Sequence, residues 1–490
     1  MKKLLLLVLI FTTFLHVVTS AETAVETPAE APAQRSREDQ RRDILRFGTE
    51  TEIANLIQTL RNENESAFDA EIIEIAKRTR NRGILTGIFG FFADTEKSGL
   101  EERAIRAIND RDYETPETVL AAIGYLGRVR AAEAVDVLKE LINTGETRFL
   151  NTAIRALGRA ANGHEEISDS TALFLLDYFE YRRPADENRR EIIVAIGETG
   201  SNKGVSFLSG MITNNDERIP LRMAALEAMS KIGDADGLDA VIEAVSSPDP
   251  NVRSTAVAAL GPFSGEEVEN AILEAFRDSF YRTRVGAARA AGTRQLESAI
   301  PFLRFRAEND TVPAVRDASI RALGAINSEE SMAILDSLFT NRRNSDSARV
   351  LAADMLVRND GDKFGIRVAM EMDDARTRNQ THLYNGFVRV LATARSNSLE
   401  DFARRLINGP GGVIERSLAL DIVLNNELRS LEREVRTLLD ERRHGQSIAQ
   451  KAQRTLDMLG LVESDTPEDA EDDNPEGSPS YFTAPGTLID

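Results

Sequence analysis

The stretch Asn251-Val-Arg-Ser-Thr-Ala-Val-Ala-Ala-Leu-Gly261 recurs twice further along the chain. The two later copies are Thr283-Arg-Val-Gly-Ala-Ala-Arg-Ala-Ala-Gly292 and Ala314-Val-Arg-Asp-Ala-Ser-Ile-Arg-Ala-Leu-Gly324. Each copy has apolar residues at helical spacing and ends at glycine, the residue that most readily adopts the left-handed conformation that closes a helix. The stretch therefore predicts a short amphipathic helix that is repeated along the chain.

The repeat extends in both directions from these three copies. Weaker copies end at Gly127, Gly158, Gly197 and Gly233, and degenerate ones end near Val357, Ala394, Leu424 and Gly460. From Gly127 to Gly324 the spacings are 31, 39, 36, 28, 31 and 32 residues, the length of one helical hairpin. A second helical pattern precedes each copy, as in residues 134–142 and 237–245. Because stacked hairpins can share one core, we predict an all-α solenoid over residues 41–460, with about 11 or 12 units, clearest over residues 100–360.

These units resemble the HEAT repeats, in particular the compact bacterial form related to phycobilisome-lyase-type HEAT-like repeats. The resemblance rests on Asp249 with Pro-Asn-Val-Arg253, on Asp310 with Arg316, on Asp216 with Arg222, and on the Ala-Leu-Gly endings. It covers residues 100–360 well and is looser toward both ends. It implies a right-handed superhelix of helical hairpins, in which the second helix of each hairpin lines the concave surface.

Composition excludes several classes of function. The net charge of −20 argues against a nucleic-acid binder, because affinity for phosphate depends on a surplus of Lys and Arg. With no cysteine, the chain has no disulfide, thiolate metal site or thiol nucleophile. Only nine of the 60 basic residues are lysines, so the planar guanidinium group predominates among the cations.

Both ends of the chain differ from the repeats. Lys2-Lys3, the apolar run 4–18 and the small residues that follow predict a signal peptide over residues 1–21, and hence export to a periplasmic or extracellular space without membrane insertion after cleavage. An uncleaved anchor is the alternative, although 15 residues rise only about 22 Å as a helix and the hydrocarbon core measures about 30 Å. Residues 22–40 are expected to form a disordered linker, and residues 461–490 a disordered acidic tail.

One series of arginines follows the repeat. It comprises Arg189, Arg253, Arg284, Arg316 and Arg349, each eight residues before the closing position, and Arg416 fits the same frame. Near the start of a second helix, such an arginine can reach the turn aspartate and carbonyls of its own or the next unit. We therefore expect a structural ladder of charge-assisted hydrogen bonds, which the HEAT resemblance also implies.

A second series consists of Arg155, Arg289 and Arg321, each three residues before its glycine. If these side chains lie on the concave surface, they form a basic strip on an acidic protein, which suits an acidic segment of a protein or peptide partner. The alternative is that each pairs with a nearby Glu or Asp on a solvated face.

Catalytic and metal-binding patterns are absent from the sequence. Beyond the predicted signal peptide, the histidines are His164, His382 and His444, which belong to different units. No Gly-x-Ser-x-Gly elbow occurs, and the glycine-rich residues 409–412 lack the Lys-Ser/Thr of a phosphate-binding loop. We therefore expect no catalytic residue, no metal and no cofactor.

The sequence favours an exported, non-catalytic scaffold that holds a protein or peptide along its concave surface. One alternative is a lyase-like enzyme of the phycobilisome-related group, and another is a purely structural spacer of the cell envelope. The apolar segment 84–93 is expected to be a buried helix, with a docking patch as the alternative.

Overall fold

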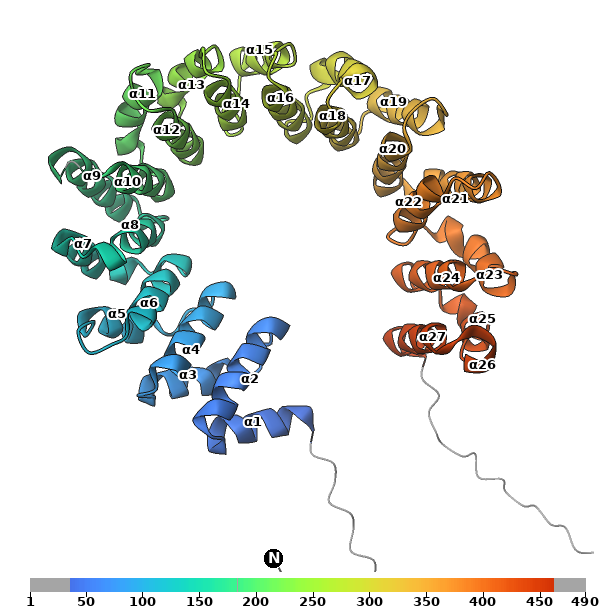
Figure 1. Ribbon diagram of the computed structural model, residues 1–490, viewed down its shortest axis with the longest axis horizontal. Coiled ribbons are helices and arrows are strands. Elements are labelled where there is room, and N and C mark those ends of the chain that lie inside the picture. Colours follow the sequence, from blue (N-terminus) through green and yellow to red (C-terminus); the bar gives the residue numbers. More distant parts are fainter. Residues whose placement is uncertain (1–35, 183, 462–490) are drawn as a thin grey trace, which may run out of the picture. The chain divides into compact units, whose positions relative to one another are not determined.

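The computed structural model describes residues 36–182 and 184–461, and over these residues the chain is almost entirely helical (Figure 1). The described residues form 27 α-helices and six short 3-10 helices, without a β-strand. The predicted all-α class is confirmed. The chain divides into two compact units, residues 1–125 and 126–490, and each unit is described by itself.

The first unit contains five complete helices and most of a sixth. Their bounds are α1 Arg37–Phe47, α2 Glu50–Glu63, α3 Asp69–Arg78, α4 Arg82–Asp94, α5 Glu101–Asn109 and α6 Pro116–Arg128. The apolar segment 84–93 lies in α4, which buries Ile84, Leu85, Ile88, Phe89, Phe91 and Phe92. Helix α4 packs on α2, and a Cβ atom on Gly90 would lie 3.0 Å from the guanidinium group of Arg61 on α2. The segment is therefore a core helix and not an exposed docking patch.

The second unit consists of first helices and second helices that alternate along the chain. The first helices are α7 Val135–Thr144, α9 Glu165–Arg182, α11 Val205–Thr213, α13 Leu238–Val245, α15 Glu266–Ala275, α17 Ile300–Asn309, α19 Glu329–Thr340, α21 Gly361–Thr377, α23 Glu400–Asn408 and α25 Glu432–Thr437. The second helices are α8 Thr147–Ala161, α10 Asp186–Thr199, α12 Ile219–Ile232, α14 Pro250–Ala259, α16 Tyr281–Thr293, α18 Pro313–Ile326, α20 Asp346–Asn359, α22 Thr381–Leu391, α24 Val413–Asn425 and α27 Gln446–Met458. A short helix, α26 Glu441–His444, precedes α27.

Within the second unit, each second helix packs on the first helix of its own hairpin and on the next second helix (Figure 1). This second-helix layer is continuous from α8 to α27, because every neighbouring pair in it is in contact. The predicted solenoid of hairpins is confirmed. Over the described residues α1 to α24 form twelve hairpins and α25 to α27 a thirteenth, compared with the 11 or 12 expected. The right-handedness of the superhelix stays a prediction.

The glycines of the repeat have a different role from the one expected. Five of them lie inside helices without a left-handed backbone: Gly127, Gly158, Gly197, Gly292 and Gly324. A Cβ atom on Gly158 would lie 2.8 Å from the Cα atom of Ala195, and one on Gly292 would lie 2.9 Å from that of Ala322. The glycines are therefore contact points between neighbouring second helices, where a side chain would keep the backbones apart. Of the seven glycine endings from Gly127 to Gly324, only Gly233 closes its helix in the left-handed conformation.

The first helix begins earlier than the sequence suggested. Helix α1 starts at Arg37, so residues 37–40, which were assigned to the linker, are helical. The Ser36 hydroxyl accepts a hydrogen bond from the Asp39 backbone N–H, which is the N-cap interaction that starts a helix. Residues 1–35, which hold the predicted signal peptide and most of the predicted linker, and residues 462–490 of the predicted acidic tail lie outside the described residues. Within the described ranges, no helix combines the length and apolar character that a membrane span requires.

Candidate functional site

The arginines of the predicted ladder occupy one structural position. Arg189, Arg253, Arg284, Arg316 and Arg349 are each the fourth residue of a second helix, on α10, α14, α16, α18 and α20. At this position the side chain lies one turn from the start of the helix, beside the turns that join first and second helices. The same position is held by Arg416 on α24.

Two arginines make the most complete set of contacts. Arg284 donates from Nε and Nη2 to the two carboxylate oxygens of Asp310, at 2.8 and 2.9 Å. It also donates to the carbonyl oxygens of Asp278 and Ser279 in its own turn. Arg253 contacts Asp278 in the same bidentate way, at 2.7 and 3.1 Å. Each arginine thus ties its own turn to the turn of the next hairpin.

The aspartates of these pairs also shape the turns. Asp278 Oδ1 accepts the Phe280 N–H at 2.7 Å, and Asp310 Oδ1 accepts the Val312 N–H at 3.0 Å. Burial by itself would raise the pKa of both carboxyl groups. The hydrogen bonds from arginine and from the backbone outweigh it and hold each pKa below its ordinary value. Both groups are therefore ionised at neutral pH.

The ladder changes chemistry along the second unit. Arg189 reaches Glu217 at 3.3 Å, and Arg349 reaches Glu371 at 2.7 Å. Arg316 donates to the Asp310 carbonyl oxygen at 2.7 Å but has no carboxylate partner among the described residues. The turn of the next hairpin carries Asn341, 25 residues after Arg316, as Asp278 lies 25 residues after Arg253. The ladder loses its charge pair at this hairpin.

Two members of the ladder position were missed by counting back from the glycine. Arg222 is the fourth residue of α12, is buried, and donates from Nε to the Ile212 carbonyl oxygen at 3.0 Å. Tyr384 is the fourth residue of α22, and its hydroxyl donates to Glu415 of the next hairpin at 2.8 Å. Counting forward from the helix start would have found Arg222, because Pro220 marks the first turn.

The three arginines of the predicted basic strip have different surroundings. Arg155 on α8 donates to Glu191 on α10 at 3.0 Å, so its charge is paired within the second-helix layer. Arg289 on α16 and Arg321 on α18 are exposed, and neither has a hydrogen bond or ion pair in the described part of the chain. They line two different cavities of the same layer.

Arg289 lines the cavity that we call the arginine groove, which has a volume of about 520 Å³ between α14 and α16. Arg282 and Arg294 line it as well, and no Asp or Glu does. Small residues on the neighbouring helices, Ala258 and Gly286 among them, leave the space open. The groove is therefore a locally cationic cavity in a chain of net charge −20.

The other two arginines of the groove form hydrogen bonds with residues that surround it. Arg294 donates to the carbonyl oxygens of Leu260 and Gly261, at 3.3 and 3.0 Å, and so satisfies the end of α14. Arg282 Nε donates to the Tyr281 hydroxyl at 3.3 Å. Neither forms an ion pair with any residue that the structure describes. Arg282 and Arg289 are seven residues apart, which puts them on one face of α16, and that spacing was visible in the sequence.

Arg321 lines a second cavity, of about 530 Å³, formed by α18, α20 and α22. His382, Arg358 and Arg389 also line it. Its acidic lining residues are Asp317, Asp346 and Asp354. Because carboxylates balance the arginines here, this cavity lacks the single sign of charge that distinguishes the arginine groove.

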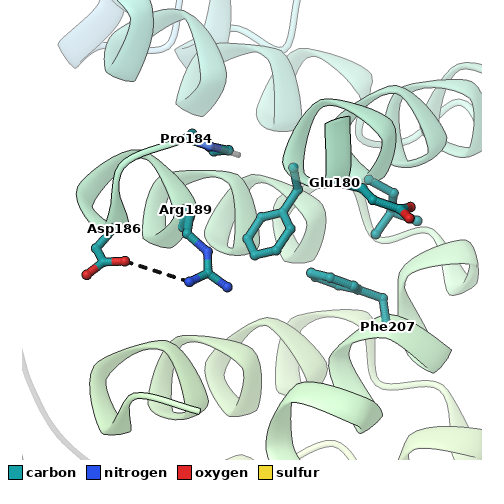
Figure 2. Close-up of a pocket in the computed structure, with 7 residues that line it drawn as sticks. Glu180, Pro184, Asp186, Arg189 and Phe207 are labelled. Atoms are coloured by element: carbon teal, nitrogen blue, oxygen red, sulfur yellow. Dashed lines mark ion pairs between the residues drawn. The ribbon is translucent and has the colours of Figure 1, made fainter. Parts of the chain in front are cut away.

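A third cavity lies beside the ladder and has a volume of about 690 Å³ (Figure 2). Its wall is aromatic, since Phe179 and Phe207 make an edge-to-face contact with ring centres 4.9 Å apart. The Arg189 guanidinium lies 4.8 Å from the centre of the Phe179 ring and 3.7 Å from Asp186. This arginine is already engaged by Glu217 and Asp186, so the cavity offers mainly apolar contacts.

The histidines do not converge on a metal site. In the described ranges no group of three or more His, Asp or Glu side chains is arranged to hold a metal ion. His164 is exposed, His382 lies in the cavity of Arg321, and His444 is buried. Burial and the nearby charge of Arg416 lower the pKa of His444, so it is neutral at pH 7.

Comparison with solved structures shows similar arrangements of helices at low sequence identity. The crystal structure of Kap121p is 10% identical with a TM-score of 0.43, and the match covers 86% of this chain and 53% of Kap121p. For the X-ray structure of YIBA_ECOLI the identity is 15%, the TM-score 0.36 and the coverage 59% and 97%. For human deoxyhypusine hydroxylase in complex with glycerol these values are 19%, 0.23, 59% and 99%. The chain thus spans about half the length of Kap121p.

Comparison with curated proteins gives no match. The model of one protein family, described as the spirochaete HEAT repeat protein, matches residues 45–455. This range includes all the helices from α2 to α26. It also includes every ladder arginine and the whole arginine groove. The chain belongs to the spirochaete HEAT repeat protein family.

Proposed function

We propose that this protein is a non-catalytic scaffold that binds an acidic segment of a protein partner in the arginine groove. The observation that carries the proposal is the set of three arginines, Arg282, Arg289 and Arg294, in one cavity without a carboxylate. A cavity of about 520 Å³ has the size of an ordinary binding pocket, and guanidinium groups bind carboxylates through paired hydrogen bonds.

The pairing of the other arginines supports this choice. Ladder arginines such as Arg253 and Arg284 have their donors satisfied by aspartates and carbonyls. Arg155 is paired with Glu191. The exposed donors of Arg289 and Arg282 remain available to a ligand, and their mutual repulsion falls when an anion binds between them.

We further propose that the protein is exported and acts in a periplasmic or extracellular space. The support is the sequence of residues 1–21, with its two lysines, apolar run and small residues. Fractionation of cells, with N-terminal sequencing of the purified protein, tests this part. A chain that keeps Met1 and stays in the cytoplasm would overturn it.

The binding proposal is tested with a fluorescein-labelled decaglutamate peptide and a glycine–serine peptide of equal length. The protein carries a neutralised tail, with the eight acidic residues of 463–476 changed to Asn or Gln, so that this segment does not compete. We expect fluorescence anisotropy to detect binding of decaglutamate but not of the glycine–serine peptide. The affinity for decaglutamate should fall as the salt concentration rises. The double variant Arg282→Gln, Arg289→Gln should bind at least about tenfold more weakly, since it lacks two charged donors.

Arg155→Gln is the matched control, because Arg155 occupies the same place in its repeat but is already paired. It should leave the affinity for decaglutamate unchanged. Equal weakening by Arg155→Gln, or equal binding of the glycine–serine peptide, would refute a specific site at the groove. A pigment or metal that copurifies in stoichiometric amount would favour a lyase-like enzyme instead.

A further inference from the structure

The last ladder arginine, Arg416 on α24, faces a histidine where other ladder arginines face a carboxylate. Its side chain makes no hydrogen bond or ion pair with any residue that the structure describes. In the turn of the next hairpin, His444 lies 28 residues after Arg416, as Glu217 lies 28 residues after Arg189. The charge of Arg416 acts on His444. An imidazole therefore replaces the carboxylate at this end of the ladder.

His444 is buried with part of its ring unsatisfied. It is 8% exposed, and its Nδ1 atom has no hydrogen-bond partner among the described residues. The Nε atom of Arg416 is buried without a partner as well. A neutral ring tolerates the nearby guanidinium group, whereas a protonated ring would be a second buried cation without a carboxylate to pair with.

We propose that the hairpin α25 to α27 is an acid-sensitive cap of the solenoid, which loosens from α24 when His444 takes up a proton beside Arg416. The hairpin is the last one that the structure describes, and α27 packs on α24. A terminal repeat of this kind covers the apolar face of the repeat before it. The inference is independent of the arginine groove and of the proposed function.

The charged groups closest to His444 favour its neutral form. Burial, followed by the charges of Arg416 and Arg443, lowers the pKa of His444, and only Asp440 opposes them. The Asp440 carboxylate is already engaged, because it accepts the backbone N–H groups of Arg442 and Arg443 at 3.0 and 3.3 Å. Protonation of His444 therefore adds a charge that its surroundings do not neutralise.

Other charged groups of this region keep their charge over the pH range that protonates a histidine. Lys451 on α27 pairs with Asp421 on α24 at 2.6 Å, and Glu434 on α25 pairs with Arg404 on α23 at 3.1 Å. Carboxyl groups ordinarily titrate near pH 4, so a change from pH 7.5 to 5.0 selects histidine. The remaining charged side chains of α24 to α27 are bound to a neighbour (Glu415 to Tyr384, Glu432 to Arg436) or exposed (Arg433, Glu441, Arg454 and Asp457).

The direction of the pH dependence follows from the lowered pKa. The unfolded hairpin takes up a proton on His444 at the ordinary pKa of 6.5, whereas the folded hairpin takes it up only at lower pH. The contribution of the neutral ring to stability is therefore fully present above pH 6.5. It is lost as the pH falls from 6.5 through the lowered pKa.

The test is amide hydrogen exchange of the full-length chain at pH 7.5 and 5.0, corrected for the intrinsic dependence of exchange on pH. We expect the protection of residues 446–458 to fall at least about threefold at pH 5.0, because the open hairpin binds the proton more tightly. Protection of α16 and α18 should stay the same. The loss should be absent in His444→Gln and smaller in Arg416→Gln, which removes the neighbouring cation.

His382→Gln is the matched control, because His382 is an exposed histidine on α22. This variant should keep the full response of residues 446–458. An equal loss of protection in α16 and α18 would mean that the whole solenoid loosens, and a loss that persists in His444→Gln would mean that another group titrates. Either result would overturn the inference. If His444→Gln releases the hairpin already at pH 7.5, Arg416→Gln decides, and an unchanged response in that variant would overturn it.

Discussion

Helix α16 carries two arginines whose surroundings are opposite. Arg284 has a side chain that is 10% exposed and donates four hydrogen bonds, two of them to a carboxylate that is 1% exposed. Arg289 lies five residues later, is exposed, and has no partner among the described residues. Residue type therefore does not reveal the role of these arginines. Structural arginines have N–H groups that are already hydrogen-bonded within the protein, whereas arginines available to a ligand have N–H groups without a partner.

The first and largest expected effect concerns stability. Arg284→Gln should lower the free energy of unfolding by about 3 kcal/mol, because it leaves Asp310 buried with only Arg306 as a charged partner. Arg289→Gln should change it by less than about 0.5 kcal/mol, as is usual for exposed positions. Urea unfolding followed by circular dichroism measures both. Similar losses for the two variants would remove the distinction between the two arginines.

The second prediction uses pH. The pKa values of Asp278 and Asp310 are held below their ordinary value, so these carboxylates stabilise the fold at neutral pH. That contribution is lost as the pH falls from the ordinary pKa of 3.8 through the lowered one. Between pH 5 and 2 the wild type should therefore lose about 2 kcal/mol more than the variant Asp278→Asn, Asp310→Asn. Parallel curves of unfolding free energy against pH would contradict it.

The third prediction concerns the buried side of the same helix. Gly292→Ala should cost about 1–2 kcal/mol, since its Cβ atom would lie 2.9 Å from the Cα atom of Ala322. Gly210→Ala on α11 is the matched control, because nothing lies within 4 Å of its Cβ position. It should stabilise the helix by about 0.5 kcal/mol. Decaglutamate binding should not change in either variant. The midpoints of thermal unfolding of the two variants and the wild type measure these effects. If Gly292→Ala raised the midpoint, Gly292 would not be a contact point between helices.

The smallest expected effect restores the interrupted ladder. Asn341→Asp would give Arg316 a carboxylate in the turn where Arg253 and Arg284 have theirs. We expect a gain of about 0.5–1 kcal/mol at pH 7 that disappears in acid, when the new carboxyl group becomes protonated. The same change in an Arg316→Gln background should give no gain. A gain that persists there would show that it arises elsewhere.

The sequence alone was sufficient to predict the helical hairpins and the resemblance to HEAT repeats. The spacing of apolar residues and a repeat length of about 30 residues predicted two helices per unit. Because a single hairpin cannot bury its apolar face, the repeats also predicted that the units stack on one another. It was also sufficient to find six of the seven ladder arginines in one frame. Arg222 was missed because the glycine of its unit, Gly233, lies three residues further from the arginine than in the other units. The distance of Arg222 from the start of its helix is the same as for the other ladder arginines.

The tertiary structure decided what the periodic glycines and arginines do. Local sequence predicts that a glycine closes a helix, but the neighbouring helix makes Gly158 and Gly292 contact points inside helices. Likewise, the pairing of Arg155 depends on Glu191, which lies 36 positions away along the chain, whereas Arg289 has no such partner among the described residues. Whether Glu191 lies within reach is set by the packing of α8 against α10. Periodicity determines which residues face a common surface, and only the contacts between hairpins determine which charges are neutralised there.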